Sequence, residues 1–220
     1  PLCLTSQELS DLKNTYYSLD KKPILMVGFN RRFSPFISKL KQSIYQINQP
    51  ISINITVNAG KISAEHWVHD QRIGGGRIIG EACHFVDLMR FLAGSKIVAS
   101  NMMMMDALTN DTASISLSFE NGSIGTLNYF ANGNKKVSKE RIEIFCGGRI
   151  AQIDNFLKMK TFSWKNLSNE RLYRQDKGQK RCMLNFIESL KSNEMLITAE
   201  ELFEVQEVML SLQANVENEA

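Results

Sequence analysis

The amino-acid sequence predicts an α+β domain with a large, mostly antiparallel open sheet and helices on one face. Several segments between residues 51 and 162 alternate apolar and polar residues, which is the pattern of strands covered on one side. Helical patterns precede and follow this region, and another is inserted into it. The first thirty residues have a different pattern, typical of the last helix and strand of a parallel α/β domain.

Two elements make up this N-terminal part. Thr5 and Glu8 have the spacing of a capping box, so we expect a helix that begins there and ends near Leu19. The run "PILMVGF" (23–29) is continuously apolar and predicts a strand buried on both faces. We therefore expect residues 1–30 to be the remnant of one domain and residues 31–220 to form a second domain.

The second domain is predicted to open with a helix. Ser34 can cap it and Pro35 can occupy its first position. Strands follow at 51–59, around 102–104 and at 112–119, and two hairpins turn at Asn121-Gly122 and Gly147-Gly148. One more strand is predicted in "LKMKTFSW", then an irregular stretch over 165–179. The chain closes with one helix over about 180–191 and another that starts at Thr198, where Glu201 completes a capping box.

Composition excludes several classes of protein. The chain has 220 residues, 43% hydrophobic and 22% charged, with a net charge of +3. Its basic residues are interleaved with acids, so we expect no nucleic-acid partner. No apolar run is long enough for a membrane span, the first residues lack signal-peptide features, and the four cysteines have no metal-site spacing. We expect a cytoplasmic protein that binds neither membrane nor metal.

The uncovered sheet face suggests an oligomer. In the strands at 51–59 and 112–119, the polar positions hold Ser, Thr and Asn instead of charged residues. A sheet face that carries no helix and few charges is suited to contact another subunit. We therefore expect a homo-oligomer formed through this face, and closed dimers are the commonest solution.

The stretch "GGGRIIGEACHFVDLMRFLAG" (74–94) carries the strongest chemical signal. After the glycines, one helix face is apolar, and Glu81 and His84 are neighbours near the helix N-terminus, with Asp87 beside His84. One interpretation is a tight loop, a first-turn acid that complements the helix dipole, and a core histidine held by Asp87. In the other, the glycines bring backbone close to a ligand and His84 moves a proton.

This stretch resembles the hallmark of the glucose-fructose oxidoreductase/inositol dehydrogenase (Gfo/Idh/MocA) family. "MVGFNRRFSP" (26–35), "HWVHD" (66–70) and "PLCLTSQEL" (1–9) resemble further family segments in the correct order. Residues 1–9 resemble the stretch that follows the Glu-Lys of the family's E-K-P motif, and Pro1 would be the proline of that motif. The resemblance implies a protein with a Rossmann domain that binds NAD or NADP, followed by a C-terminal domain that binds substrate and makes oligomer contacts.

The resemblance also implies roles for particular residues. His84 would handle the proton of the reacting hydroxyl of a sugar, sugar nucleotide or polyol. Gly80 stands where the family has an aspartate, so Glu81 would replace that acid from the next position. The expected substrate-binding residues are Asn30, Arg31, Trp67, Gly75, Gly76 and Gly80, and the expected cofactor-binding residues are Pro1 and Arg31.

Two further expectations follow from the same resemblance. The cofactor fingerprint and the catalytic lysine would precede Pro1, so the isolated chain is expected to be inactive. Together with "ERIEIFCGGRIA" (140–151), the motifs resemble a subgroup fused to a zinc alcohol dehydrogenase-like half and associated with bacterial surface-polysaccharide genes. The Gly80 departure leaves an alternative open, a non-catalytic binding or regulatory module with the same fold.

Overall fold

An eight-stranded sheet forms the centre of the molecule. The structure is a computed structural model that describes the backbone of residues 1–219 and the side chains of residues 1–216. The strand order is β2-β3-β4-β1-β5-β6-β7-β8, and every neighbouring pair is antiparallel except β1 and β4, which are parallel. The strands are β1 (Ser52–Asn58), β2 (Ile97–Met104), β3 (Ala113–Phe119), β4 (Ile124–Phe130), β5 (Glu140–Cys146), β6 (Arg149–Asp154), β7 (Lys158–Phe162) and β8 (Glu170–Arg171).

The period-two pattern explains these strands. In β1 the side chains of Ile53, Ile55 and Val57 are buried, and the polar residues between them are partly exposed. Both predicted hairpins form, and Gly122 and Gly147 take the positive φ angles, +82° and +52°, that such turns require. The short β8 lies in a stretch predicted to be irregular, because two residues are too few to show an alternation.

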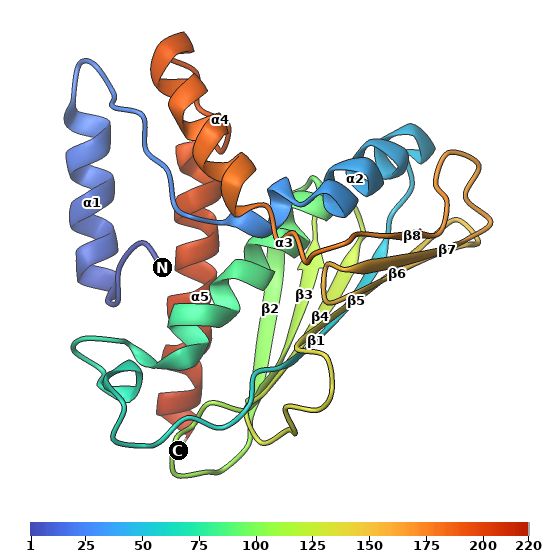
Figure 1. Ribbon diagram of the computed structural model, residues 1–220. Coiled ribbons are helices and arrows are strands. Elements are labelled where there is room, and N and C mark those ends of the chain that lie inside the picture. The colour runs from blue at the N-terminus through green and yellow to red at the C-terminus, as the bar shows by residue number, and fades with distance from the viewer. Residues whose placement is uncertain (220) are drawn as a thin grey trace.

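Five helices accompany the sheet: α1 (Ser6–Ser18), α2 (Pro35–Ile47), α3 (Cys83–Ala93), α4 (Gln179–Ser192) and α5 (Ala199–Glu219). Helices α3 and α5 pack on the same face of the sheet, and the main hydrophobic core lies between them and the strands (Figure 1). The capping box at Thr5 forms as predicted. Ser34 occupies the cap position of α2, but its hydroxyl makes no capping bond.

The predicted strand at 23–29 does not form. The segment is extended, but it pairs with no strand among the described residues. A strand needs hydrogen-bonded neighbours, and this chain supplies none beside it. Leu25 and Val27 are only partly buried, whereas the apolar run predicted burial on both faces.

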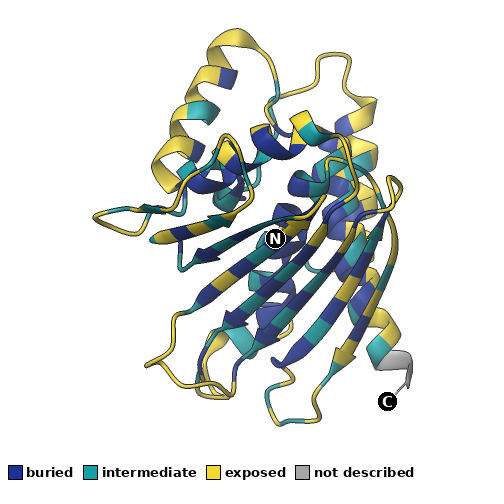
Figure 2. Cartoon of the chain, turned by 90° about the vertical axis from the view of Figure 1, so that its right-hand side faces the viewer, coloured by how far each residue is buried: buried dark blue, intermediate teal, exposed yellow. Residues whose placement is uncertain are grey.

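The opposite face of the sheet is largely free of helices (Figure 2). Over β1, β3 and β4 it carries Ser, Thr and Asn, as the sequence indicates. Over β5 to β7 it also carries charged residues, including Arg141, Glu143, Lys158 and Lys160. The uncharged part of this face is therefore limited to half of the sheet.

Membrane-spanning and metal-binding features are both missing from the described residues. No helix within residues 1–219 combines the length and the apolar character that crossing a membrane requires. In the same part of the chain, no three His, Cys, Asp or Glu side chains are grouped so that they could hold a metal ion.

Candidate functional site

The three glycines form a tight turn against two other segments. The amides of Gly74 and Gly75 both donate to the Asp70 carbonyl, at 2.8 and 3.0 Å. A Cβ on Gly74 would lie 2.5 Å from the Val68 carbonyl oxygen, and one on Gly75 would lie 2.5 Å from a Leu4 methyl. The absent side chains thus make room for the protein's own chain.

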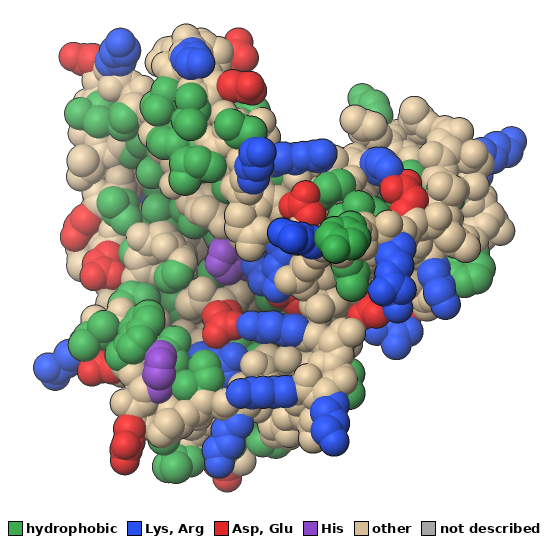
Figure 3. Space-filling view, in the orientation of Figure 1, with side chains coloured by type: hydrophobic (Ala, Val, Ile, Leu, Met, Phe, Trp, Pro, Cys, Tyr) green, Lys and Arg blue, Asp and Glu red, His purple; other side chains and the backbone are tan. Residues whose placement is uncertain are grey.

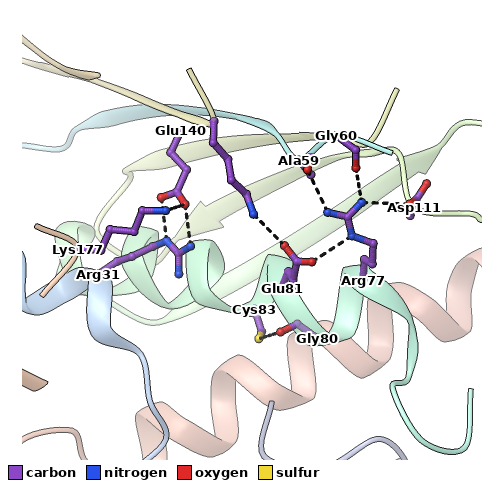
Figure 4. A network of polar contacts seen from close by, with 11 residues as sticks. Arg31, Ala59, Gly60, Arg77, Gly80, Glu81, Cys83, Asp111, Glu140 and Lys177 are labelled. Carbon is purple, nitrogen blue, oxygen red and sulfur yellow. Dashed lines mark hydrogen bonds and ion pairs between the residues drawn. The ribbon is translucent and has the colours of Figure 1, made fainter. Parts of the chain in front are cut away.

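One π-helical turn, Ile78–Ala82, joins these glycines to α3. Arg77 is wholly buried at its start and donates to the Gly60 carbonyl at 2.7 Å and to Glu81 at 3.0 Å (Figure 4). Its guanidinium also lies 3.4 Å from Asp111. Arg77 therefore fixes the start of the helix to the end of β1 and to the loop before β3.

Glu81 is held as a carboxylate. Its other oxygen lies 3.5 Å from the Lys139 ammonium, and about a third of its side chain is exposed. Burial alone would raise the pKa of Glu81, but Arg77 and other neighbours outweigh it and lower the pKa below its usual 4.5. At neutral pH this group accepts hydrogen bonds and is poorly suited to release or take up a proton.

His84 lies one turn further along, at the start of α3. Its ring meets that of Phe29 edge to face at 5.6 Å, and Nδ1 is buried without a hydrogen-bond partner among the described residues. Burial first, then the neighbouring Arg31, lowers the pKa of His84 from 6.5 to about 4. The imidazole is therefore neutral at physiological pH.

Asp87 does not orient His84, and that expectation is wrong. Its carboxylate binds the Arg32 guanidinium through two contacts, one of them 3.0 Å from Arg32 Nε. Arg32 also donates to Glu201 at 3.1 Å, so the three residues link η1 (Asn30–Phe33), α3 and α5. Asp87 is completely buried, and its role here is to hold these elements together.

A second buried ion cluster lies beside His84. Arg31 donates to both oxygens of Glu140, at 2.9 and 3.0 Å, and Lys177 donates to one of them at 2.7 Å (Figure 4). The Arg31 guanidinium stacks 4.3 Å above the Phe85 ring, and its Nη1 has no acceptor among the residues that the structure describes. Asn30 donates to the Lys177 carbonyl at 2.7 Å.

Glu140 and Lys177 were not among the predicted site residues. The signal for Glu140 was present, because it stands in phase with the buried positions Ile142 and Ile144 of its strand. A charged residue on the buried side of an alternating strand requires a buried counter-charge. No local sequence pattern predicts Lys177 as a site residue, because its position depends on the path of the loop before α4.

The predicted site residues do not share one hollow. Pro1, Trp67, Gly80 and Glu81 line one open hollow together, and Trp67 is 60% exposed there. Gly75 and Gly76 line a separate, smaller hollow beside α5. His84 on α3 and Arg31 on η1 belong to neither lining set. His84 is close enough to the Pro1 amino group for that charge to lower its pKa.

The surface around these groups is mixed in charge. In Figure 3, lysine and arginine side chains gather over the middle of the molecule, with acidic groups between them. The Lys139 side chain is 43% exposed, and Glu81, 3.5 Å from its ammonium, supplies the opposite charge.

Comparison with known proteins gives consistent matches. Residues 46–149 match the family model described as the GFO/IDH/MocA C-terminal domain. The chain is 29% identical over 143 residues to the uncharacterized oxidoreductase YrbE of Bacillus subtilis, covering 60% of this chain and 40% of that protein. It is 28% identical over 134 residues to myo-inositol 2-dehydrogenase of Thermotoga maritima, covering 56% and 38%.

A solved structure confirms the fold. Levoglucosan dehydrogenase, in complex with NADH, superposes with a TM-score of 0.77 at 18% identity, over 98% of this chain and 68% of that one. The chain spans about two fifths of the length of the curated relatives that it matches. None of these matches shows a fusion to a zinc alcohol dehydrogenase-like half. Over residues 46–149 the chain is therefore similar to the C-terminal domain of the Gfo/Idh/MocA oxidoreductases, and the two curated relatives agree with that similarity.

Proposed function

We propose that this chain is the substrate-binding part of an NAD- or NADP-dependent dehydrogenase that acts on a carbinol of a sugar, sugar nucleotide or polyol. The observation that carries the proposal is the position of His84 on α3, one turn after Glu81, with Nδ1 buried and without a hydrogen-bond partner among the described residues. One relative is named for its action on myo-inositol and one structural neighbour for levoglucosan, and both compounds are polyhydroxylated.

His84 is proposed to take the proton of the reacting hydroxyl. A base must be unprotonated before it can act, and the lowered pKa keeps the ring neutral above about pH 4. The chain is helical without a break from Gly76 to Ala93, so the helix N-terminus, whose free N–H groups favour negative charge, lies at the glycines before His84. Oxidation of a carbinol requires this proton transfer together with loss of a hydride.

Glu81 and Arg31 are proposed to orient the substrate. The Glu81 carboxylate is anchored by Arg77 and can accept hydrogen bonds from neighbouring hydroxyls. Arg31 is immobilised by its two bonds to Glu140 and keeps Nη1 for a ligand oxygen. Trp67, Gly80 and Pro1 would line the approach, and Asn30 would hold the Lys177 loop in place. The roles of Gly75 and Gly76 in substrate binding stay a prediction.

The nicotinamide cofactor would be held mainly by residues outside this chain. No G-x-G-x-x-G occurs in the 220 residues, and Pro1 and Arg31 are the contacts proposed from this side. When bound, the cofactor would supply the hydride acceptor or donor. The chain's own residues would bind the carbinol, orient it and move its proton.

The test is a set of variants in the full-length protein, assayed by nicotinamide absorbance with a panel of sugars, sugar nucleotides and inositols. His84→Ala is expected to lower turnover about a hundredfold or more, the usual scale for a general acid or base. Glu81→Gln should lower turnover by a smaller factor. Asp70 is exposed in the neighbouring loop, so Asp70→Asn should leave turnover almost unchanged and serves as the control.

Two results would contradict the proposal. If His84→Ala keeps full turnover but melts far earlier than the parent, the histidine is a core residue. If no substrate in the panel changes the absorbance while sugars bind in calorimetry, the protein is a binding or regulatory module. The Gly80 departure from the family pattern is the observation that favours that second function.

A further inference from the structure

Tyr129 is a buried polar residue whose hydroxyl needs a partner. It belongs to β4, where it is paired with Val57 of β1 and Ala113 of β3, and its side chain is completely buried. The hydroxyl meets no acceptor in good hydrogen-bonding geometry among the described residues. Buried hydroxyls in folded proteins nearly always have a hydrogen-bond partner, so we expect a nearby group to accept from this one.

The Glu81 carboxylate is the acceptor that the neighbourhood supplies. The Arg77 guanidinium lies 5.4 Å from the centroid of the Tyr129 ring and binds Glu81 at 3.0 Å, so the tyrosine and the acid share one buried neighbour. Burial first, then the Glu81 carboxylate, raises the pKa of the Tyr129 hydroxyl above its usual 10, and Asp111 acts on it more weakly. The hydroxyl therefore keeps its proton at physiological pH and can donate a hydrogen bond to a carboxylate.

We propose that Tyr129 is a positioning residue of the substrate site: its hydroxyl donates to the Glu81 carboxylate and, together with Arg77, fixes that carboxylate for a ligand. The inference rests on the proposed function, in which Glu81 orients the substrate. Tyr129 itself touches no ligand, because its side chain is completely buried. It acts only through Glu81.

Glu81 needs such support because its side chain is partly exposed and lines the open hollow with Trp67. A glutamate held by nothing samples several rotamers, and a ligand that binds it must first restrict them. Arg77 holds one carboxylate oxygen from the same helical turn (Figure 4), and Tyr129 adds a buried contact from the sheet. Lys139 contributes less, because its ammonium is 3.5 Å away and partly exposed to water.

The first test is the pKa of Glu81 in the full-length protein, measured by NMR with isotope-labelled glutamate carboxyl groups. Tyr129→Phe removes one oxygen and keeps the buried ring, and it leaves Arg77, Lys139 and Asp111 in place. A hydrogen bond to the charged form of an acid lowers its pKa, so Tyr129→Phe should raise the pKa of Glu81 above that of the parent. Glu81→Gln identifies the signal. An unchanged pKa would overturn the proposal, and this readout needs no catalytic activity.

The second test is the steady-state kinetics of the same variant, with a substrate that the parent turns over. Tyr129→Phe should raise KM about tenfold, the effect of one hydrogen bond to a charged group, and should change kcat much less. Added to Glu81→Gln, the same change should have no further effect on KM, because it acts through Glu81. Equal effects on KM with and without the Glu81 carboxylate would contradict the proposal.

Tyr16→Phe is the matched control. Tyr16 is a buried tyrosine of α1 whose hydroxyl contacts the Met195 sulfur at 3.2 Å, so its loss should change neither readout. If Tyr129→Phe lowers the melting temperature but leaves the pKa of Glu81 and KM at the parent values, Tyr129 only fills the core and the proposal is wrong. If the parent turns over no compound while Tyr129→Phe raises the pKa of Glu81, Tyr129 still positions Glu81 and the dehydrogenase function alone is refuted.

Discussion

Replacement of Glu140 by glutamine tests whether the buried ion cluster beside His84 holds the site together. The Glu140 carboxylate is completely buried and neutralises both Arg31, at 2.9 and 3.0 Å, and Lys177, at 2.7 Å. Glu140→Gln keeps the shape and removes the charge, which leaves two cations without their counter-ion. Breaking a buried ion pair in this way costs about 3–5 kcal/mol of unfolding free energy.

The structure places Glu140→Gln at the lower end of that range. Arg31 and Lys177 remain 12% and 17% exposed, so water can partly solvate them after the change. We therefore expect a loss of about 3 kcal/mol, which for a domain of this size lowers the melting temperature by about 6–12 °C. Urea unfolding followed by circular dichroism measures the free energy, and calorimetry measures the melting temperature.

The matched control is Glu143→Gln on the same strand. Glu143 faces the open side of the sheet and pairs with Arg141, which is 61% exposed, so its loss should cost less than about 1 kcal/mol. Equal losses for the two variants, or a loss below 1 kcal/mol for Glu140→Gln, would refute the assignment of a stabilising role to the buried cluster.

Glu140→Gln and the parent should differ in acid. Burial alone would raise the pKa of Glu140, but Arg31 and Lys177 outweigh it and hold the pKa below 4.5. A carboxylate with a lowered folded-state pKa stabilises the fold above its unfolded-state pKa, and that stability is lost as the pH falls below 4.5. Unfolding of Glu140→Gln should therefore show a weaker dependence on pH below 4.5 than unfolding of the parent.

Three further predictions concern the rest of the molecule. The His84 ring should titrate near pH 4 by NMR, and a titration near 6.5 would contradict the assignment. Because the unfolded chain takes up this proton first, the fold should lose up to about 3 kcal/mol of stability as the pH falls from 6.5 to 4. His84→Gln should remove this loss. The chain should self-associate through the open sheet face, and Thr126→Arg in the middle of that face should yield a monomer in light scattering; a parent that is monomeric at high micromolar concentration would count against this. The isolated chain should neither turn over a sugar nor bind NAD(P)H saturably in calorimetry. Tight binding would show that this chain holds the cofactor without a G-x-G-x-x-G segment.

The sequence determined the features that depend on neighbouring residues. The alternation of Ile53, Ile55 and Val57 predicted a strand and its buried face, because successive side chains of a strand point to opposite sides. Thr5 and Glu8 predicted the start of α1, because a capping box is closed within four residues. The motif from Gly74 to Gly94 placed His84 and Glu81 near one helix start, because residues three apart on a helix are neighbours.

Only the tertiary structure decided the partners of charged groups and the state of the segment at 23–29. Asp87 stands beside His84 in the sequence pattern, yet Arg32, 55 residues away, takes its carboxylate, since a buried acid goes to the strongest counter-charge in reach. The pKa of His84 near 4 likewise depends on burial and on Arg31, which come from other elements. The run at 23–29 has the composition of a buried strand, but a strand is completed by hydrogen-bonded neighbours, and no described strand pairs with this run.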